Sequence, residues 1–284
     1  QILPEIEDKI EVKKVIENEF SIKNINRAVG TRISYYLLKK YGNEKLEEDF
    51  LTLKFKGSAG QSFGAFGIKG LKLILEGDAN DYVAKGLSGA SITIKLPKDS
   101  NLISNQNTII GNTVLYGATS GNLFASGKAG ERFAVRNSGA VAVVEGAGDH
   151  CCEYMTGGIV MVLGETGVNF AAGMSGGIAY VYDSDNNFSN NCNKAMVEVE
   201  SITRSDSTDT SNIFEKKTLL ERDDLRIRTM LKRHINYTNS KKARKILENF
   251  EENIKKFYKI FPLDFKKALE QSVRSKKDKI KKTL

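Results

Sequence analysis

Short runs in which apolar and polar residues alternate recur through the first two thirds of the chain. The first is Leu51-Thr-Leu-Lys-Phe-Lys56, and similar runs follow at residues 71–76 and 91–96. Alternation with a period of two places every second side chain on the same face of a strand. Turn-forming residues such as Gly77 and Pro97 end the runs. The pattern therefore predicts a series of short β-strands.

A longer period arranges these strands as a coil. A Ser or Thr followed by glycine returns at Gly121, Gly139, Gly157 and Gly176, at intervals of 18, 18 and 19 residues. Of the 25 glycines, 23 lie within residues 57–177. A fixed period of this length with small-residue turns is typical of a solenoid. The sequence predicts a mainly β protein, a right-handed parallel β-helix of six or seven turns with ~18–19 residues each.

Aligning the turns on the repeated glycine brings like residues into columns. Successive turns of a β-helix stack residue on residue, so we expect the apolar columns to fill the interior of the coil. Glycines are expected at the corners, where the chain often needs a positive φ. Two positions after the glycine, the column is Leu123, Val141, Ile159 and Ile178. Five positions after it, the column is Ser126, Val144, Val162 and Val181. Six positions before it, the column is Leu115, Phe133, Cys151 and Phe170.

The N-terminal flank, residues 1–50, has the longer apolar period of helices. A second helix is predicted over 27–41, with Gly42 as its stop. The residues that suggest the first helix are Val12, Val15, Ile16 and Phe20.

The C-terminal flank is also predicted to be helical. Helical spacing covers residues 219–238 and 241–258, and a further short helix is expected at 265–273, before a frayed lysine-rich end. The open ends of a solenoid must be covered. We therefore expect the coil to have α-helical flanks that cap both ends.

These patterns divide the chain into four parts. Residues 1–50 form a helical segment, and 51–200 form the β-helix domain, with a last strand at 195–200. Residues 201–212 are rich in Ser, Thr and Asp and form a linker or loop. Residues 213–284 form a basic helical segment.

The charge is concentrated in that last part. Residues 213–284 hold 22 Lys and Arg against 10 Asp and Glu, whereas the whole chain has a net charge of +8. The rest of the chain is therefore slightly acidic, and the basicity belongs to the C-terminal segment. Its lysines alternate with apolar residues of the helices, which favours a solvated face over nucleic-acid binding.

Length and composition narrow the class of protein further. No apolar run reaches 18 residues, so no membrane span is expected. No signal peptide is visible, and the chain does not begin with Met, so we expect a processed protein or a piece of a longer one. Three cysteines are too few for a disulfide framework, which favours a reducing compartment, namely the cytoplasm, or a plastid in a eukaryote.

Two motifs resemble nucleophile or phosphate sites. Gly60-Gln-Ser62-Phe-Gly64 fits the G-x-S-x-G elbow, but a glycine-rich segment follows where the elbow needs a helix. A plain turn is therefore the favoured interpretation. Gly127-Lys128-Ala129 has the Gly-Lys pair of a phosphate loop, but Gly121 stands one position too far upstream and Ala129 replaces the metal-binding hydroxyl.

The histidines and cysteines suggest a metal site only weakly. His150-Cys151-Cys152-Glu153 groups ligand types, but adjacent cysteines lack the C-x₂-C spacing of a chelate. Core packing is favoured for these cysteines. His234 lies among basic residues of a predicted helix and is expected at the surface.

Several carboxylates lie near the predicted corners. Carbohydrate-active β-helix enzymes use paired acids on one face, and spacing leaves that alternative open. Corner acids more commonly accept hydrogen bonds from turn amides. The residues concerned are Glu76, Asp78, Asp81, Glu131, Glu145, Asp149 and Glu165.

A run of motifs in order resembles the C-terminal GXGXG β-helix domain of the glutamate synthase large subunit. The flanks at 26–34 and 234–243 resemble that family too, so the likeness covers about 22–269, although Cys151 stands where a small residue is expected. The motifs occupy residues 57–66, 75–83, 85–89, 110–112, 115–121, 130–139, 144–146, 148–150, 152–158 and 169–181.

The resemblance implies a structural role. Glutamate synthase converts glutamine, 2-oxoglutarate and two electrons into two glutamates, and its GXGXG domain packs between the catalytic domains. FMN and an iron–sulfur cluster are expected in the rest of the enzyme. The resemblance therefore implies no catalytic, cofactor-binding or metal-binding residue in this chain.

The implied partners are the amidotransferase, central and FMN-binding domains, with a reductase subunit or ferredoxin, and neither nucleic acid nor a membrane. Two alternatives remain at this point. One is a β-helix subunit of another redox complex, such as formylmethanofuran dehydrogenase. The other is a free-standing β-helix enzyme that acts on polysaccharide.

Overall fold

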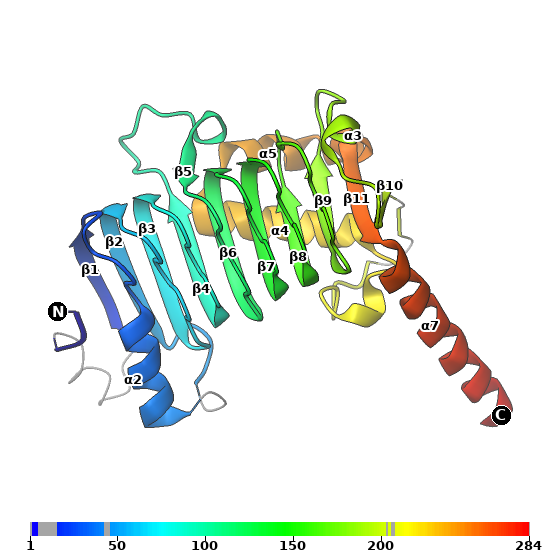
Figure 1. Cartoon of the computed structure of the whole chain (residues 1–284), viewed down its shortest axis with the longest axis horizontal. Helices are drawn as coiled ribbons and strands as arrows, with labels where there is room; N and C mark the ends of the chain where they lie inside the picture. The colour runs from blue at the N-terminus through cyan, green and yellow to red at the C-terminus, as the bar shows by residue number, and fades with distance from the viewer. Residues whose placement is uncertain (1, 5–15, 43–45, 203, 206–207, 284) are drawn as a thin grey trace.

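The protein folds as a parallel β-solenoid of about seven turns, in agreement with the mainly β prediction (Figure 1). The computed structural model describes residues 2–4, 16–42, 46–202, 204–205 and 208–283. Its parallel strands stack side by side from one end of the molecule to the other. They are β1 (Ile16–Ile22), β2 (Leu51–Ala59), β3 (Leu71–Ala79), β4 (Ser88–Lys95), β5 (Thr108–Ile110), β6 (Ser120–Ala129), β7 (Ser138–Ala147), β8 (Thr156–Val162) and β9 (Gly176–Tyr182).

The three alternating runs that predicted strands lie in β2, β3 and β4. The register pairs Leu51 with Leu71 and Lys72 with Ser91, so one turn of the coil takes about 20 residues here. Between β4 and β6 the repeat is longer, because Ser91 pairs with Asn122. The additional residues form a loop that contains the short helix η1 (Ser104–Gln106) and β5.

Each turn contains a corner whose backbone bonds to the next turn. Alternate corner residues have positive φ, and their N–H groups donate to carbonyls of a neighbouring turn. Ser62 donates to Asp81 in the following turn, and Ala134 donates to Val114 in the preceding one. Glycines were expected to occupy these positions, but side-chain-bearing residues hold many of them. The stacked hydrogen bonds offset the cost of a left-handed conformation for such residues, which is about 1–2 kcal/mol.

The interior of the coil is apolar, but the columns differ from the glycine-based alignment by one residue at β6. Ala142 pairs with Leu123, whereas Val141 pairs with Asn122, and Val144 pairs with Ala125 rather than Ser126. In the corner column, Val114 and not Leu115 stands beside Phe133, because its carbonyl accepts from Ala134 N–H. The buried column in these corners is Phe63, Val83, Val114, Phe133, Cys151 and Phe170.

One predicted interior column faces outward at Val141, Ile159 and Ile178, whereas its first member, Leu123, lies in the core of the coil. Ile159 and Ile178 belong to a second apolar cluster with the C-terminal helices, whereas their neighbours Val160 and Ala179 belong to the core of the coil. The prediction was wrong because it assumed that the sheet has a single apolar face. Strands β7 to β9 are buried on both faces and read as nearly continuous apolar runs, as covered parallel strands do.

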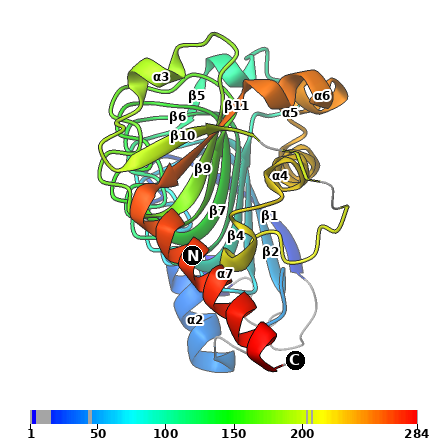
Figure 2. The ribbon, with the colours of Figure 1, turned by 90° about the vertical axis from the view of Figure 1, so that its right-hand side faces the viewer.

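The C-terminal helices cover a side of the solenoid rather than its end. Figure 2 views the molecule from its C-terminal side and shows α4 (Asp223–Thr238), α5 (Lys241–Glu248) and α6 (Phe250–Asn253) along one flank of the stacked strands. Strands close the end instead, because β11 (Phe257–Pro262) pairs antiparallel with β9, and β10 (Val197–Ser201) pairs with β11. The expectation that these helices cap the coil was therefore wrong.

The sequence also misassigned the chain after α5. Residues 241–258 were predicted as one helix, but α5 ends at Glu248, α6 and the short helix η3 (Ile254–Lys256) follow it, and Phe257 begins β11. Another short helix, η2 (Lys216–Thr218), precedes α4. The last helix, α7 (Leu263–Thr283), extends beyond residues 265–273 and through the lysine-rich end that was expected to fray. A four-residue helix, α3 (Phe188–Asn191), follows β9.

The N-terminal flank is part strand and part helix. Ile16 and Phe20 lie in β1, which pairs in parallel with β2, so the helix predicted around them is wrong where the structure describes it; Val12 and Val15 lie outside the described residues. The ring of Phe20 stacks on Phe55, 5.7 Å away, which explains why the segment extends the coil.

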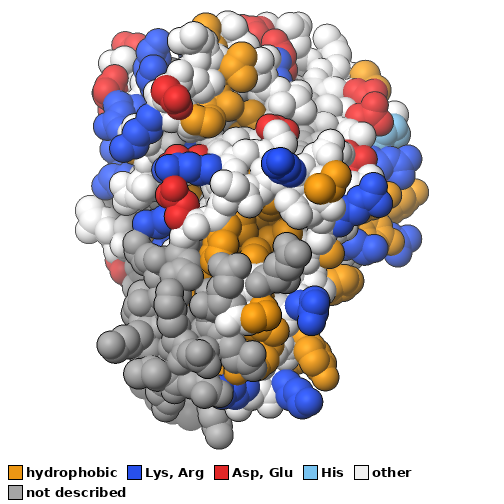
Figure 3. Space-filling model, turned by 90° about the vertical axis from the view of Figure 1, so that its left-hand side faces the viewer, with side chains coloured by type: hydrophobic (Ala, Val, Ile, Leu, Met, Phe, Trp, Pro, Cys, Tyr) orange, Lys and Arg blue, Asp and Glu red, His pale blue; other side chains and the backbone are white. Residues whose placement is uncertain are grey.

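The second predicted N-terminal helix is confirmed as α2 (Thr31–Tyr41), which ends at Gly42. Its Ile33 and Leu37 are buried in the core cluster. Figure 3 shows hydrophobic side chains gathered at this end of the molecule. Among the described residues, no helix is both long and apolar enough to cross a membrane.

Candidate functional site

The outer face of β6 to β9 is where the C-terminal segment docks on the solenoid. The ring of Phe124 stacks on Tyr237 at 4.8 Å, and Arg233 donates to the side-chain oxygen of Asn122 at 2.9 Å. Apolar side chains from both sides bury one another between sheet and helices. Members of this interface are Phe124, Val143, Ile159, Met161, Ile178, Tyr180, Ile227, Met230, Leu231, Ile246 and Phe250.

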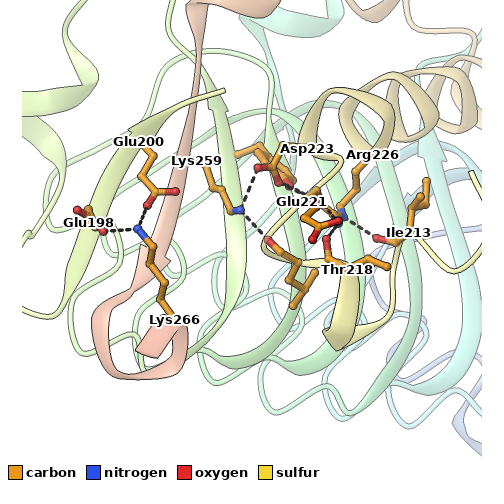
Figure 4. A network of polar contacts seen from close by, with 11 residues as sticks. Glu198, Glu200, Ile213, Thr218, Glu221, Asp223, Arg226, Lys259 and Lys266 are labelled. Carbon is orange, nitrogen blue, oxygen red and sulfur yellow. Dashed lines mark hydrogen bonds and ion pairs between the residues drawn. The ribbon is translucent and has the colours of Figure 1, made fainter. Parts of the chain in front are cut away.

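A buried ionic network lies within this interface (Figure 4). The carboxylate of Asp223, in the first turn of α4, accepts from Lys259 Nζ at 2.9 Å and from Arg226 Nη1 at 2.7 Å. It also accepts from the hydroxyl of Tyr180 on β9. The network thus links β9, α4 and β11, which are far apart in the sequence.

Arg226 is fully buried and completely paired. Its Nε donates to the carbonyl of Ile213, Nη1 to Tyr180 and Asp223, and Nη2 to the carbonyls of Thr218 and Glu221. A guanidinium has five N–H donors, so every donor has a partner. The segment before α4 therefore binds the guanidinium of Arg226 through three of its backbone carbonyls.

The network is electrostatic and structural in character. Burial raises the pKa of Tyr180 well above its usual range, and burial lowers the pKa of Lys259, although Asp223 opposes that shift. Lys259 also donates to the carbonyl of Leu219 at 2.6 Å. With every polar group engaged, the arrangement holds two segments together and leaves no side chain poised to react.

A second polar contact fixes α7 to β10 (Figure 4). Lys266 pairs with Glu198 at 2.8 Å and with Glu200. The hydrogen bonds that Lys266 donates to the two carboxylates raise its pKa. The three side chains are partly exposed to solvent, which screens these ion pairs, so their contribution to stability is small.

A separate buried cluster joins β7 to the turn between α4 and α5. Glu145 accepts from the hydroxyl of Ser240, and His234 Nε2 lies 3.6 Å from Glu145 Oε1. Burial opposes ionisation of Glu145, but its interactions with nearby His234 and with the hydroxyl of Ser240 together outweigh it, and its pKa is lowered. His234 was expected at the surface and is fully buried, because the helix face that carries it covers the outer side of the sheet.

Residues 60–64, which fit the G-x-S-x-G pattern, form a corner of the coil between β2 and β3. Ser62 has φ 65°, and its N–H donates to the carbonyl of Asp81 in the next turn. His150 occupies the equivalent corner position four turns further on, roughly 19 Å away at ~4.8 Å per strand. His234 is buried beneath the helices, so neither histidine can serve Ser62 as a base.

The two adjacent cysteines are core residues, as predicted. Cys151 and Cys152 are fully buried with their sulfurs 3.8 Å apart, and burial raises the pKa of Cys151 well above its usual range. A protonated buried thiol is a poor nucleophile and a poor ligand. His150 Nδ1 lies 3.5 Å from Oε1 of Glu153, three residues further on, so these two side chains contact each other within a single corner of the coil.

The corner carboxylates mostly serve turns and ion pairs. Asp81 accepts from Asn112 N–H and Asp149 from Val168 N–H, each in the next turn of the coil. Hydrogen bonding to turn amides was the more common of the two roles considered for corner acids.

Glu165 pairs with Lys128, which is the lysine of the Gly-Lys motif and lies in β6. Glu131 donates its backbone N–H to the side chain of Asn112. Glu76 pairs with Lys95, and Asp78 accepts from Ser58.

Within the described ranges, no group of three His, Cys, Asp or Glu side chains could hold a metal ion. Sequence reasoning missed Asp223, Arg226 and Lys259, which hold the C-terminal segment in place. The sequence did contain one sign that Lys259 is buried. It stands within the short aromatic run of residues 257–261, and a strand there would place it between apolar neighbours.

The stacked parallel strands, the corner ladders and the covered outer face define a parallel β-solenoid domain. A family model described as "GXGXG motif" matches residues 1–263, so the chain belongs to the GXGXG family.

Three curated relatives are similar to nearly the whole chain. The glutamate synthase (NADPH) large chain of Bacillus subtilis is 49% identical over 269 residues, which are 94% of this chain and 17% of that protein. The glutamate synthase (NADH) of Schizosaccharomyces pombe is 48% identical over 94% of this chain and 12% of its own length. The ferredoxin-dependent glutamate synthase 2 of Synechocystis is 43% identical over 91% and 16%. The chain thus spans less than a fifth of the relatives that it matches.

Proposed function

We propose that this chain is the scaffold domain of a glutamate synthase, and that it holds the amidotransferase and FMN-binding domains of one large chain in their relative positions. The complete reaction would convert glutamine, 2-oxoglutarate and two electrons into two glutamates. FMN, the iron–sulfur cluster and the catalytic residues would lie in the other domains. This proposal assigns no catalytic, cofactor-binding or metal-binding residue to the chain itself.

The partners in this proposal are the amidotransferase, central and FMN-binding domains, with ferredoxin or a reductase subunit as electron source. The proposed location is the cytoplasm, or a plastid in a eukaryote. The chain is 43–49% identical in sequence to three glutamate synthases that are named for different electron donors, which supports a role that all of them share.

The observation that carries the proposal is the presence of exposed apolar side chains at several corners of the coil. Phe66 and Tyr154 are each 53% exposed, and Val168 is 50% exposed. The ring of Phe66 lies over Gly86 of the next turn and that of Tyr154 over Gly173, where a Cβ would meet the ring at about 2.6 Å. Rigid, exposed aromatic side chains are typical anchors of protein interfaces.

The proposal is tested by placing charges on this edge in the intact large chain. Phe66→Glu together with Tyr154→Glu should lower glutamine-dependent glutamate formation by about tenfold or more, equivalent to ~1.4 kcal/mol. Glutaminase activity should persist, because the amidotransferase domain is itself unchanged. Circular dichroism and the melting temperature check that the coil remains folded.

Leu102→Glu is the matched control, since Leu102 is 56% exposed and lies in the loop between β4 and β5, outside the corner segments. This variant should retain both activities. Full glutamate formation in the double variant would contradict the proposal.

A further inference from the structure

A large cavity lies beside the contact between Ser240 and Glu145. It has a volume of about 530 Å³ and lies between the loop after β4 and the turn that begins α5. Clefts of this size accommodate small-molecule ligands. Residues 96–105 form one wall, and residues 238–242 and Lys245 form the other.

The lining of this cavity is strongly basic. It contains five lysines and, within the described part of the chain, no aspartate or glutamate; the lysines are Lys95, Lys98, Lys241, Lys242 and Lys245. Lys95 pairs with Glu76 at 3.1 Å. No ion pair is found for Lys98, Lys241 or Lys245 among the described residues. Burial lowers the pKa of Lys242, so this ammonium lacks full compensation for its desolvation.

The backbone adds donors on the same side. Ser240 caps α5 by accepting from Ala243 N–H, and its hydroxyl is engaged with Glu145. The N–H groups of Lys241 and Lys242 have no hydrogen-bond partner among the described residues. The N-terminus of a helix favours anions through such amides and through its dipole.

A buried hydroxyl in the cavity wall also lacks a partner. Ser126 of β6 is more than nine-tenths buried and lines the cavity, yet no hydrogen bond is found for it in the described structure. A ligand oxygen at this position would satisfy it.

Two acids lie near Lys242, namely Glu165 and Glu145, whose Oε2 has no hydrogen-bond partner among the described residues. Glu145 lies under Ser240 and His234, and Glu165 pairs with Lys128. They leave the cavity with an excess of positive charge and of free donors. From the cavity, the lysines, the free amides and Ser126, we infer a binding site for a small polyanion that carries phosphate or carboxylate groups. This inference does not depend on the proposed function.

Calorimetric titration of the intact protein with inorganic pyrophosphate and, separately, with succinate tests the site. We expect at least one of the two anions to bind at low ionic strength and to bind more weakly at 0.5 M NaCl, where charges are screened within ~4 Å. The relative affinities distinguish a phosphate ligand from a carboxylate ligand. Failure of both anions to bind overturns the inference.

Three variants separate the site from general surface charge. Lys241→Gln with Lys245→Gln should weaken binding by about tenfold or more, since each removes a charged donor. Ser126→Ala should weaken binding severalfold without changing the net charge. Lys255→Gln with Lys256→Gln removes two exposed lysines of η3 and should leave the affinity unchanged. Equal losses in the two double variants overturn the inference.

Discussion

The carboxylate of Asp223 lies 2.9 Å from Nζ of Lys259, and this contact ties the first turn of α4 to the strand that closes the solenoid. The same carboxylate also faces Arg226 at 2.7 Å. One buried anion therefore compensates two buried cations. Within this network, the charge balance depends on this single acid.

Asp223→Ala should lower the free energy of unfolding by about 3–5 kcal/mol, because it leaves the charges of Arg226 and Lys259 buried without a counterion. Denaturant titration followed by circular dichroism measures the change. Asp264→Ala removes a carboxylate that is 94% exposed and should change stability by less than ~0.5 kcal/mol. A loss at Asp223 as small as that would show that the network is not what holds α4.

Glu145 should make stability depend on acid pH. Its folded pKa is depressed below the ordinary 4.5, so its contribution is present above that pH and is lost as pH falls through the folded pKa. Glu145→Gln has no carboxyl group to titrate, so this part of the slope should disappear. Unfolding free energies between pH 3 and pH 6 give the comparison, with Glu131→Gln, at an exposed position, as the control. Identical slopes in wild type and Glu145→Gln would refute the assignment.

Gly77 should tolerate no side chain. It has φ 150°, and a Cβ there would lie 1.9 Å from the carbonyl oxygen of Gly57 in the preceding turn. Gly77→Ala should therefore cost about 3 kcal/mol or more, from backbone strain together with separation of two turns. Gly117 also has positive φ (64°), but a Cβ there meets nothing within 4 Å, so Gly117→Ala should cost only ~1 kcal/mol. Thermal melting ranks the two variants, and equal costs would exclude the clash.

Cys192 should react slowly with alkylating reagents at neutral pH. Burial raises its pKa to about 11, so little thiolate is present until the pH approaches that value. Its rate of modification by iodoacetamide should rise about tenfold per pH unit below pH 11. Mass spectrometry of the folded protein follows the reaction, with buried Cys151 and Cys152 as internal controls that remain unmodified. Rapid labelling of Cys192 at pH 7 would contradict this.

The strands and their parallel stacking could be predicted because both depend on local repeats. Alternation identified β2, β3 and β4, and the glycine spacing identified the coil. The spacing of glycines differs from the true register at β6, because the step from Asn122 to Val141 is one residue longer than the step from Gly121 to Gly139. Hydrogen bonds between turns, which no local pattern reports, determine that register.

The placement of the C-terminal segment could be predicted only in part. Helical periodicity located α4, but it could not show which face of the coil α4 covers. The apolar outer positions Ile159 and Ile178 carried that information, since strands buried on both faces lose their alternation. His234 and Arg226 were missed for the same reason, because basic residues on a helix are usually exposed unless a specific partner is buried with them.

The uniform stacking of β1 to β9 also determines a distance. Neighbouring strands lie ~4.8 Å apart, so the seven steps from β1 to β9 extend over about 34 Å. Surfaces that dock at the two ends would be kept apart by this length, and the length can change only by whole turns. Removing one turn would shorten the gap by ~4.8 Å and would preserve the register of the strands on either side. The number of turns in the coil therefore sets the distance between its two ends, in steps of one strand spacing.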